Sequence, residues 1–156
     1  MKRAVVMERD YPYPPERVWR ALTDSRALAE WLMPNDFQPR VGHKFQFNVG
    51  PQWGWRGFVD CVVLELDEPR RLAYSWEGDP KHPPTVVTWT LTPIEGGTRL
   101  RLAHTGFQGL RGLFLKFILG SGWKGMLRTS LPAVIARLDK QDVPPEGGGQ
   151  AGPLRE

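Results

Sequence analysis

The side chains best suited to acid–base or nucleophilic chemistry are few in this sequence and stand apart from one another. The three histidines, His43, His82 and His104, are isolated, and Cys61 is the only cysteine. We find no glycine-rich nucleotide loop and no histidine spacing typical of a metal site. One cysteine cannot form an intrachain disulfide or a cysteine cage for a metal. The sequence therefore predicts no cofactor, no metal and no set of catalytic residues.

His104 is the best candidate for a chemical role. Alternation along its predicted strand places it on the same face as Leu100 and Leu102. It is either a hydrogen-bonded or rim histidine without a chemical role, or a residue that contacts a ligand or donates a proton in a cyclase-like pocket. Cys61 lies in an apolar run with no base beside it in sequence. We interpret it as an inert core thiol.

Aromatic residues are the more informative group. The chain of 156 residues has seven tryptophans and seven phenylalanines. Large rings in this number furnish a thick core or line a cavity, and composition alone leaves both open.

The elements that must position these side chains are predicted from hydrophobic spacing and turn residues. A strand over Lys2–Asp10 precedes two short helices. Five more strands in hairpins follow, and their consecutive pairing predicts an antiparallel sheet with one apolar face. The first helix is expected over Glu16–Thr23, and the second runs through Trp31 after a cap at Asp24 or Ser25. The later strands are expected over 44–49, 56–66, 71–77, 87–92 and 99–104.

A long amphipathic helix is predicted over Gly122–Leu138. Five apolar residues recur on one face, and Pro132 should bend the helix. Such a helix is the natural cover for the apolar face of the sheet. The predicted fold is α+β, with a curved antiparallel sheet wrapped around the C-terminal helix. The five apolar residues are Trp123, Leu127, Leu131, Ile135 and Leu138.

The segment Leu110–Leu119 is apolar on nearly all sides and is predicted to form a separate helix. Four roles stay open for it: ordinary packing, a lid over a cavity, a dimer contact or an element that touches a membrane. It lies inside residues 96–138, which contain seven basic and no acidic residues. This basic region is either solvated surface or a site for anionic lipid, an anionic ligand or an acidic protein. Nucleic acid is not expected, because no nucleic-acid-binding motif accompanies the charge.

Residues 1–140 are expected to form one domain, and residues 141–156 a disordered tail rich in proline and glycine. The first residues lack a signal-peptide pattern, and no apolar run is long enough to span a membrane. We therefore expect a cytoplasmic protein.

Four sequence segments occur in a fixed order: YPYPPERVWRALTD, LELDEPRRLAYSW, VTWTLTPIEGGTRLRLAHTGF and the GW that opens the last helix. In this order they resemble the START-like helix-grip (SRPBCC) superfamily, in particular the branch named after activators of a heat-shock chaperone's ATPase. Together they extend from Tyr11 to Leu138. The apolar Leu110–Leu119 and Pro132 differ from the pattern of this branch, whose members tend to have a polar segment before GW.

The resemblance implies a hydrophobic cavity between sheet and helix, and superfamily members include lipid carriers, hormone receptors and cyclases. We expect non-catalytic binding of a small hydrophobic molecule, either aromatic or acyl. The alternatives are a cofactor-free cyclase, dehydratase or hydrolase in the same cavity, and an interaction protein associated with a chaperone. The expected wall residues are Phe45, Phe47, Tyr74, Trp76, Trp89, Leu102, His104, Trp123 and Leu127.

Overall fold

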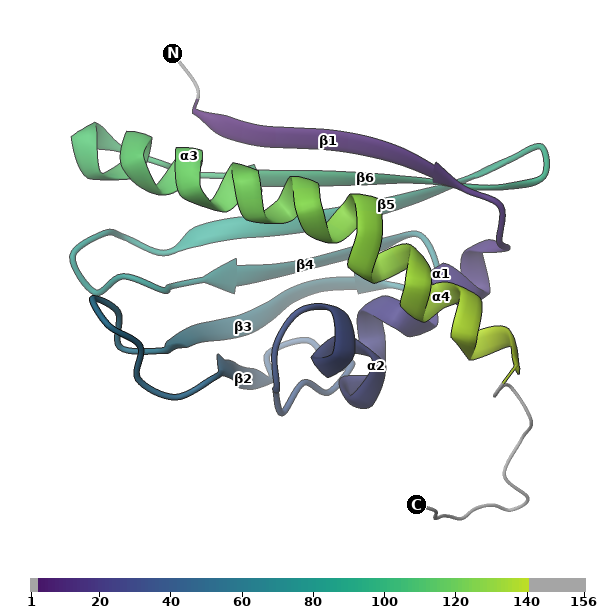
Figure 1. Cartoon of the computed structure of the whole chain (residues 1–156), viewed down its shortest axis with the longest axis horizontal. Helices are drawn as coiled ribbons and strands as arrows, with labels where there is room; N and C mark the ends of the chain where they lie inside the picture. Colours follow the sequence, from purple (N-terminus) through teal and green to yellow (C-terminus); the bar gives the residue numbers. More distant parts are fainter. Residues whose placement is uncertain (1–2, 141–156) are drawn as a thin grey trace.

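The computed structural model describes residues 3–140, so the predicted tail, 141–156, lies outside the described residues. The helices and strands follow the predicted order (Figure 1). They are β1 (Ala4–Tyr11), α1 (Pro15–Thr23), α2 (Ser25–Trp31), β2 (Lys44–Asn48), β3 (Phe58–Asp67), β4 (Arg71–Trp76), β5 (Thr85–Ile94), β6 (Gly97–Thr105), α3 (Gly109–Gly125), the π-helical turn η1 (Met126–Ser130) and α4 (Leu131–Lys140).

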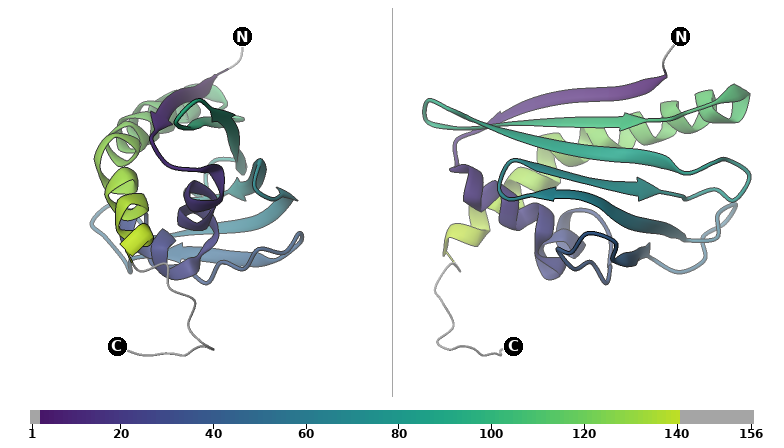
Figure 2. Two further views of the ribbon diagram at one scale, coloured as in Figure 1. Left: turned by 90° about the vertical axis from the view of Figure 1, so that its right-hand side faces the viewer. Right: turned by 180° about the vertical axis from the view of Figure 1, so that it is seen from behind.

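The strands form one antiparallel sheet of six, in the order β1-β6-β5-β4-β3-β2. Alternation sends every second side chain to the concave face, where Trp89 pairs with Leu102 and Val87 with His104. These four side chains are fully buried. Figure 2 shows the sheet curving around the C-terminal helix, with the two short helices closing the end beside α4. The predicted fold class is therefore confirmed.

Local sequence explains the two short helices. Pro15 stands at the first position of α1, where a missing backbone N–H costs nothing. The Asp24 carboxylate caps α2 by accepting from the backbone N–H groups of Arg26 and Ala27, at 2.9 and 3.2 Å. The apolar stripes of both helices, including Trp19 and Trp31, are buried against the core.

The C-terminal helix is longer than predicted. The sequence prediction of separate helices over Leu110–Leu119 and Gly122–Leu138 was wrong, because α3, η1 and α4 run without a break from Gly109 to Lys140. The backbone N–H of Met126 donates to the carbonyls of Gly122 and Trp123, so the helical ladder continues past the glycines. A glycine inside a helix costs only about 1 kcal/mol, which the packing of the adjacent turns outweighs.

The predicted disturbance at Pro132 takes the form of a π-helical turn. The N–H of Leu131 donates to Met126 O, five residues back, and Pro132 has no N–H to donate. The carbonyl of Leu127 is satisfied from outside the helix, by the Tyr11 hydroxyl at 2.6 Å. Figure 1 shows the helix turning downward from α3 to α4 around this point. Strand β1 thus supplies the hydrogen bond that the proline removes.

Replacing this hydroxyl should destabilise the fold. Tyr11→Phe leaves the buried Leu127 carbonyl without its partner, and we expect the free energy of unfolding to fall by about 1–3 kcal/mol. Urea denaturation followed by circular dichroism measures the change. Tyr13→Phe is the matched control, because the Tyr13 ring lies under the Arg17 guanidinium and keeps that contact without its hydroxyl. Equal losses in the two variants would contradict the role given to Tyr11.

Candidate functional site

A cavity of about 630 Å³ lies beneath the first half of α3, at the end of the sheet formed by β3, β4 and β5. The helix forms its roof, and the loops after β2 and β4 form its sides. Its lining is mostly apolar. The lining residues are Met33, Gly54, Trp55, Arg56, Val59, Trp76, Glu77, Gly78, Asp79, Pro80, Lys81, His82, Pro83, Thr85, Phe107, Arg111, Phe114, Leu115, Ile118 and Leu119.

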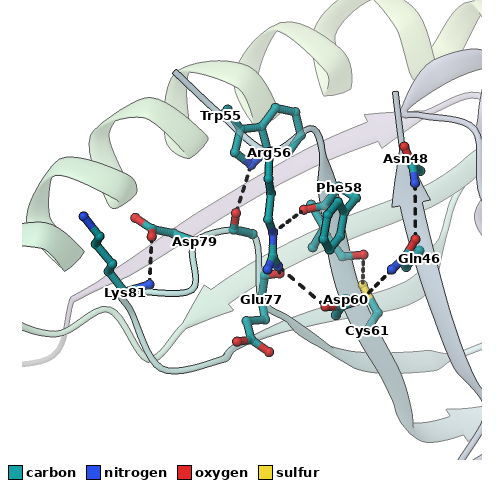
Figure 3. Close-up of polar contacts among 12 residues, drawn as sticks. Gln46, Asn48, Trp55, Arg56, Phe58, Asp60, Cys61, Glu77, Asp79 and Lys81 are labelled. Atoms are coloured by element: carbon teal, nitrogen blue, oxygen red, sulfur yellow. Dashed lines mark hydrogen bonds and ion pairs between the residues drawn. The ribbon is translucent and has the colours of Figure 1, made fainter. Parts of the chain in front are cut away.

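The two loops at the side of the cavity are hydrogen-bonded to each other (Figure 3). Trp55 Nε1 donates to Gly78 O at 2.9 Å, so the loop between β2 and β3 is fixed to the loop after β4. Arg56 donates to Glu77 O at 2.6 Å, and its guanidinium lies 4.1 Å from the centre of the Phe58 ring. These contacts hold the Trp55 side chain in the cavity wall.

His82 joins the loop after β4 to the start of α3. Its Nε2 accepts from the Gln108 backbone N–H at 2.9 Å, which leaves Nδ1 to donate to Pro83 O at 2.7 Å. Both ring nitrogens are therefore used by the backbone. Gly112 permits this approach, since a Cβ there would lie 2.8 Å from His82 Nε2 and 2.9 Å from the Phe107 carbonyl carbon.

An ion pair closes the same corner of the cavity. Arg111, in the first turn of α3, donates to the Asp79 carboxylate. Burial acts to raise the pKa of Asp79, but the hydrogen bonds from Arg111 and from the Lys81 backbone N–H outweigh it, and the net effect is a lowered pKa. Asp79 is therefore a stable anion that anchors the roof of the cavity.

The inner end of the cavity is closed by a buried chain of hydrogen bonds centred on His104. Trp123 Nε1 donates to His104 Nδ1 at 3.0 Å. The Thr85 hydroxyl donates to Trp76 O at 3.0 Å, so its oxygen accepts from His104 Nε2 at 2.7 Å. Each partner fixes the next, and His104 is held as the neutral tautomer with its proton on Nε2.

Burial reinforces this assignment. It disfavours the charged ring and lowers the pKa of His104 to about 3. Aromatic rings surround the histidine: the ring centre of Trp76 lies 5.6 Å away, and that of Phe107 4.8 Å. Of the two interpretations drawn from the sequence, the geometry matches the hydrogen-bonded core histidine.

The sequence matches a known protein family. The model of a family described as "Activator of Hsp90 ATPase homolog 1-like protein" matches residues 12–136 of the chain. The chain belongs to this family. A comparison with curated proteins finds no match.

Solved structures agree with this family and fold. The crystal structure of protein MLL2253 from Mesorhizobium loti is 39% identical, covers 90% of this chain and 100% of its own, and has a TM-score of 0.76. CalU16 from Micromonospora echinospora (24% identity, 90% and 80% coverage, TM-score 0.71) and BH1534 from Bacillus halodurans (24%, 86% and 99%, TM-score 0.71) share the fold. The resemblance to helix-grip proteins is confirmed.

The structure places the nine expected wall residues in two groups. Trp76 lines the cavity. The other eight are buried in the core beside its closed end. Aromatic rings among them pack against one another: the ring centres of Trp89 and Trp123 lie 5.5 Å apart, and those of Phe45 and Tyr74 5.4 Å. The cavity is therefore displaced towards the start of α3. The eight are Phe45, Phe47, Tyr74, Trp89, Leu102, His104, Trp123 and Leu127.

Several cavity residues were missed by sequence reasoning. The loop after β4 contributes His82 and Asp79, and α3 contributes Arg111. No sequence pattern indicates that this loop and this helix are in contact. Trp55, which is not among the nine expected wall residues, also lines the cavity. The one usable signal was the apolar character of residues 110–119, for which a lid over a cavity was among the open roles: Phe114, Leu115, Ile118 and Leu119 form the roof.

Three further observations concern metal binding, the Cys61 thiol and membranes. Across residues 3–140, no three histidine, cysteine or carboxylate side chains gather closely enough to hold a metal ion. Burial raises the pKa of Cys61, so the thiol is unreactive at neutral pH. In the same part of the chain, no helix has the length and apolarity needed to cross a membrane.

The close approach at Gly112 can be tested by adding one methyl group. Gly112→Ala should force the start of α3 away from His82 and Phe107 and lower the free energy of unfolding by about 1–3 kcal/mol. Gly125→Ala is the matched control: a Cβ there meets nothing within 4 Å. It should stabilise the helix by up to about 1 kcal/mol. Thermal unfolding compares the two, and shifts in the same direction would contradict this account.

The His104 network predicts a pH dependence. Between the ordinary value of 6.5 and about 3, the unfolded chain binds a proton that folded His104 does not. The contribution of this residue to the free energy of unfolding should fall as the pH falls through that window, by up to about 1.4 kcal/mol per pH unit. Urea denaturation between these limits should give a shallower slope for His104→Gln than for the parent. An equal slope would show that His104 binds a proton as readily in the folded protein as in the unfolded chain, which would contradict this account.

Proposed function

We propose that this protein binds a small hydrophobic molecule, with an aromatic or acyl body, in the cavity beneath α3. The observation that supports the proposal is the cavity itself. Its volume of about 630 Å³ falls within the range typical of small-molecule sites, and its lining is mostly apolar. Superfamily members with the same architecture commonly use this space for hydrophobic ligands.

The arrangement of the lining suggests how such a molecule would lie. The roof offers Leu115 and Leu119, and the inner end offers Trp76 and Phe107. Charged groups stand at the other end, where the exposed Lys81 is beside the Asp79–Arg111 pair. An apolar body would contact the inner wall, and a polar or anionic end would face Lys81.

The histidines and carboxylates in and near the cavity already have hydrogen-bond or ion-pair partners within the protein or point away from α3, which favours binding without catalysis. The two nitrogens of His82 are used by backbone groups, and Asp79 is paired with Arg111. His104 lies behind the wall with both nitrogens satisfied. Glu77 lines the cavity through its position in the loop, but Figure 3 shows its carboxylate directed away from the helix. Cofactor-free catalysis, association with a chaperone and a cytoplasmic location stay predictions.

The proposal is tested by filling the cavity. Leu115→Trp places a large ring in the roof, and we expect it to weaken binding of a neutral naphthylamine probe at least about tenfold, because the ring takes the volume that the probe needs. Fluorescence titration measures the dissociation constant, and a long-chain fatty acid should displace the probe.

Leu113→Trp is the matched control. Leu113 is on the same helix but outside the lining, with its side chain exposed. It should bind the probe as the parent does. If the parent shows no saturable binding, or if both variants bind equally well, the cavity is not the binding site.

A further inference from the structure

The outward side of α3 is apolar where a surface helix is normally polar. Leu110 is 85% exposed and Phe117 79% exposed, and Phe114 between them is 62% exposed. Steps of four and three residues place these three side chains on one line along the helix. Leu113 and Ile118 flank the line and are about half exposed. We call these five residues the outer face of α3.

The cavity accounts for only part of this face, through Phe114 and Ile118. Its roof needs the side of the helix that carries Leu115 and Leu119, and Leu110 and Phe117 take no part in the lining. Most surface apolar residues stand singly, but a contiguous apolar patch on a helix marks an interaction surface. The outer face therefore requires a partner of its own.

The charge around the outer face indicates which partner. Across α3 and η1 there are four basic residues and no acidic one: Arg111, Lys116, Lys124 and Arg128, of which Arg111 is paired with Asp79 from the loop after β4. Lys124 lies seven residues after Phe117, and so continues the line of the outer face. An apolar helix face bordered by lysine and arginine is the pattern of helices that lie in the plane of a membrane surface.

We propose that the outer face of α3 docks on an anionic lipid membrane surface, with its apolar side chains among the acyl chains and its basic residues at the headgroups. A second copy of the chain fits less well. A two-fold contact through this face would bring the basic borders of both copies together, and α3 and η1 offer no carboxylate to compensate them. An anionic membrane supplies both the apolar phase and the opposite charge.

Docking would also orient the cavity. Phe114 and Ile118 belong to the outer face and to the cavity lining at once. The cavity edge therefore meets the lipid surface when the face is docked, and a hydrophobic molecule could pass between bilayer and cavity without crossing water. This last step rests on the proposed function; the docking itself does not.

Vesicle sedimentation tests the docking. We expect the parent protein to sediment with vesicles containing about a third phosphatidylglycerol, and at least about tenfold less with pure phosphatidylcholine or at high salt. Leu110→Glu combined with Phe117→Glu, neither of which lines the cavity, should abolish sedimentation, and Lys124→Glu should weaken it about fivefold. Val41→Glu is the control: it removes an exposed apolar residue just before β2, the opposite edge of the sheet from β1, and should sediment like the parent.

The outcomes separate the alternatives. Equal sedimentation of the parent and the double glutamate variant, or no preference for anionic vesicles, would overturn the docking. Analytical ultracentrifugation without lipid would show a dimer that dissociates in the double variant if the partner were a second copy, which would also overturn it. Naphthylamine binding measured without vesicles reports on the cavity alone. Failure of membrane docking and failure of ligand binding in the cavity can therefore be told apart.

Discussion

The structure depends on a hydrogen-bond chain that crosses its core, from Trp123 through His104 and Thr85 to the Trp76 carbonyl. It joins α3 to three strands of the sheet, β6, β5 and β4. Buried polar groups are costly unless every one is paired, so this chain fixes both the tautomer of His104 and the position of the helix over the sheet. Because Trp76 and Thr85 also line the cavity, the same contacts define its inner end.

The cavity lies beneath the half of the continuous helix that is less deeply packed into the core. From Trp123 onward, its inward side chains, Leu127, Leu131 and Ile135, are fully buried in the core. Tyr11 and Arg17 hold the backbone of this half by donating to carbonyls of η1 and α4. The first half of α3 extends over the end of the sheet along β1 (Figure 1). Continuity of the helix places this half over a space that side chains do not fill.

The sequence predicted the fold well because strand alternation, capping residues and helix spacing are local signals. Asp24 was identified as a cap candidate and caps α2, and the alternation around Trp89 and Leu102 gave the buried face correctly. The cavity was harder to place, since spacing shows which rings point inward but not whether they interlock. The rings around Trp123 do interlock, and the open space lies beside residues such as His82 that only tertiary contacts bring to the helix.

The two halves of the helix should therefore differ in stability. The start of α3 is held mainly by polar contacts: the Asp79–Arg111 pair, the Gln108–His82 bond and the Arg3 guanidinium on Gly109 O. A hydrogen bond or a partly exposed ion pair contributes only about 1 kcal/mol net, whereas a fully buried apolar side chain contributes more. Opening the first half consequently costs less free energy than opening the second. The half of the helix that opens more easily is thus the roof of the cavity, and its outer side carries the exposed apolar residues Leu110, Phe114 and Phe117.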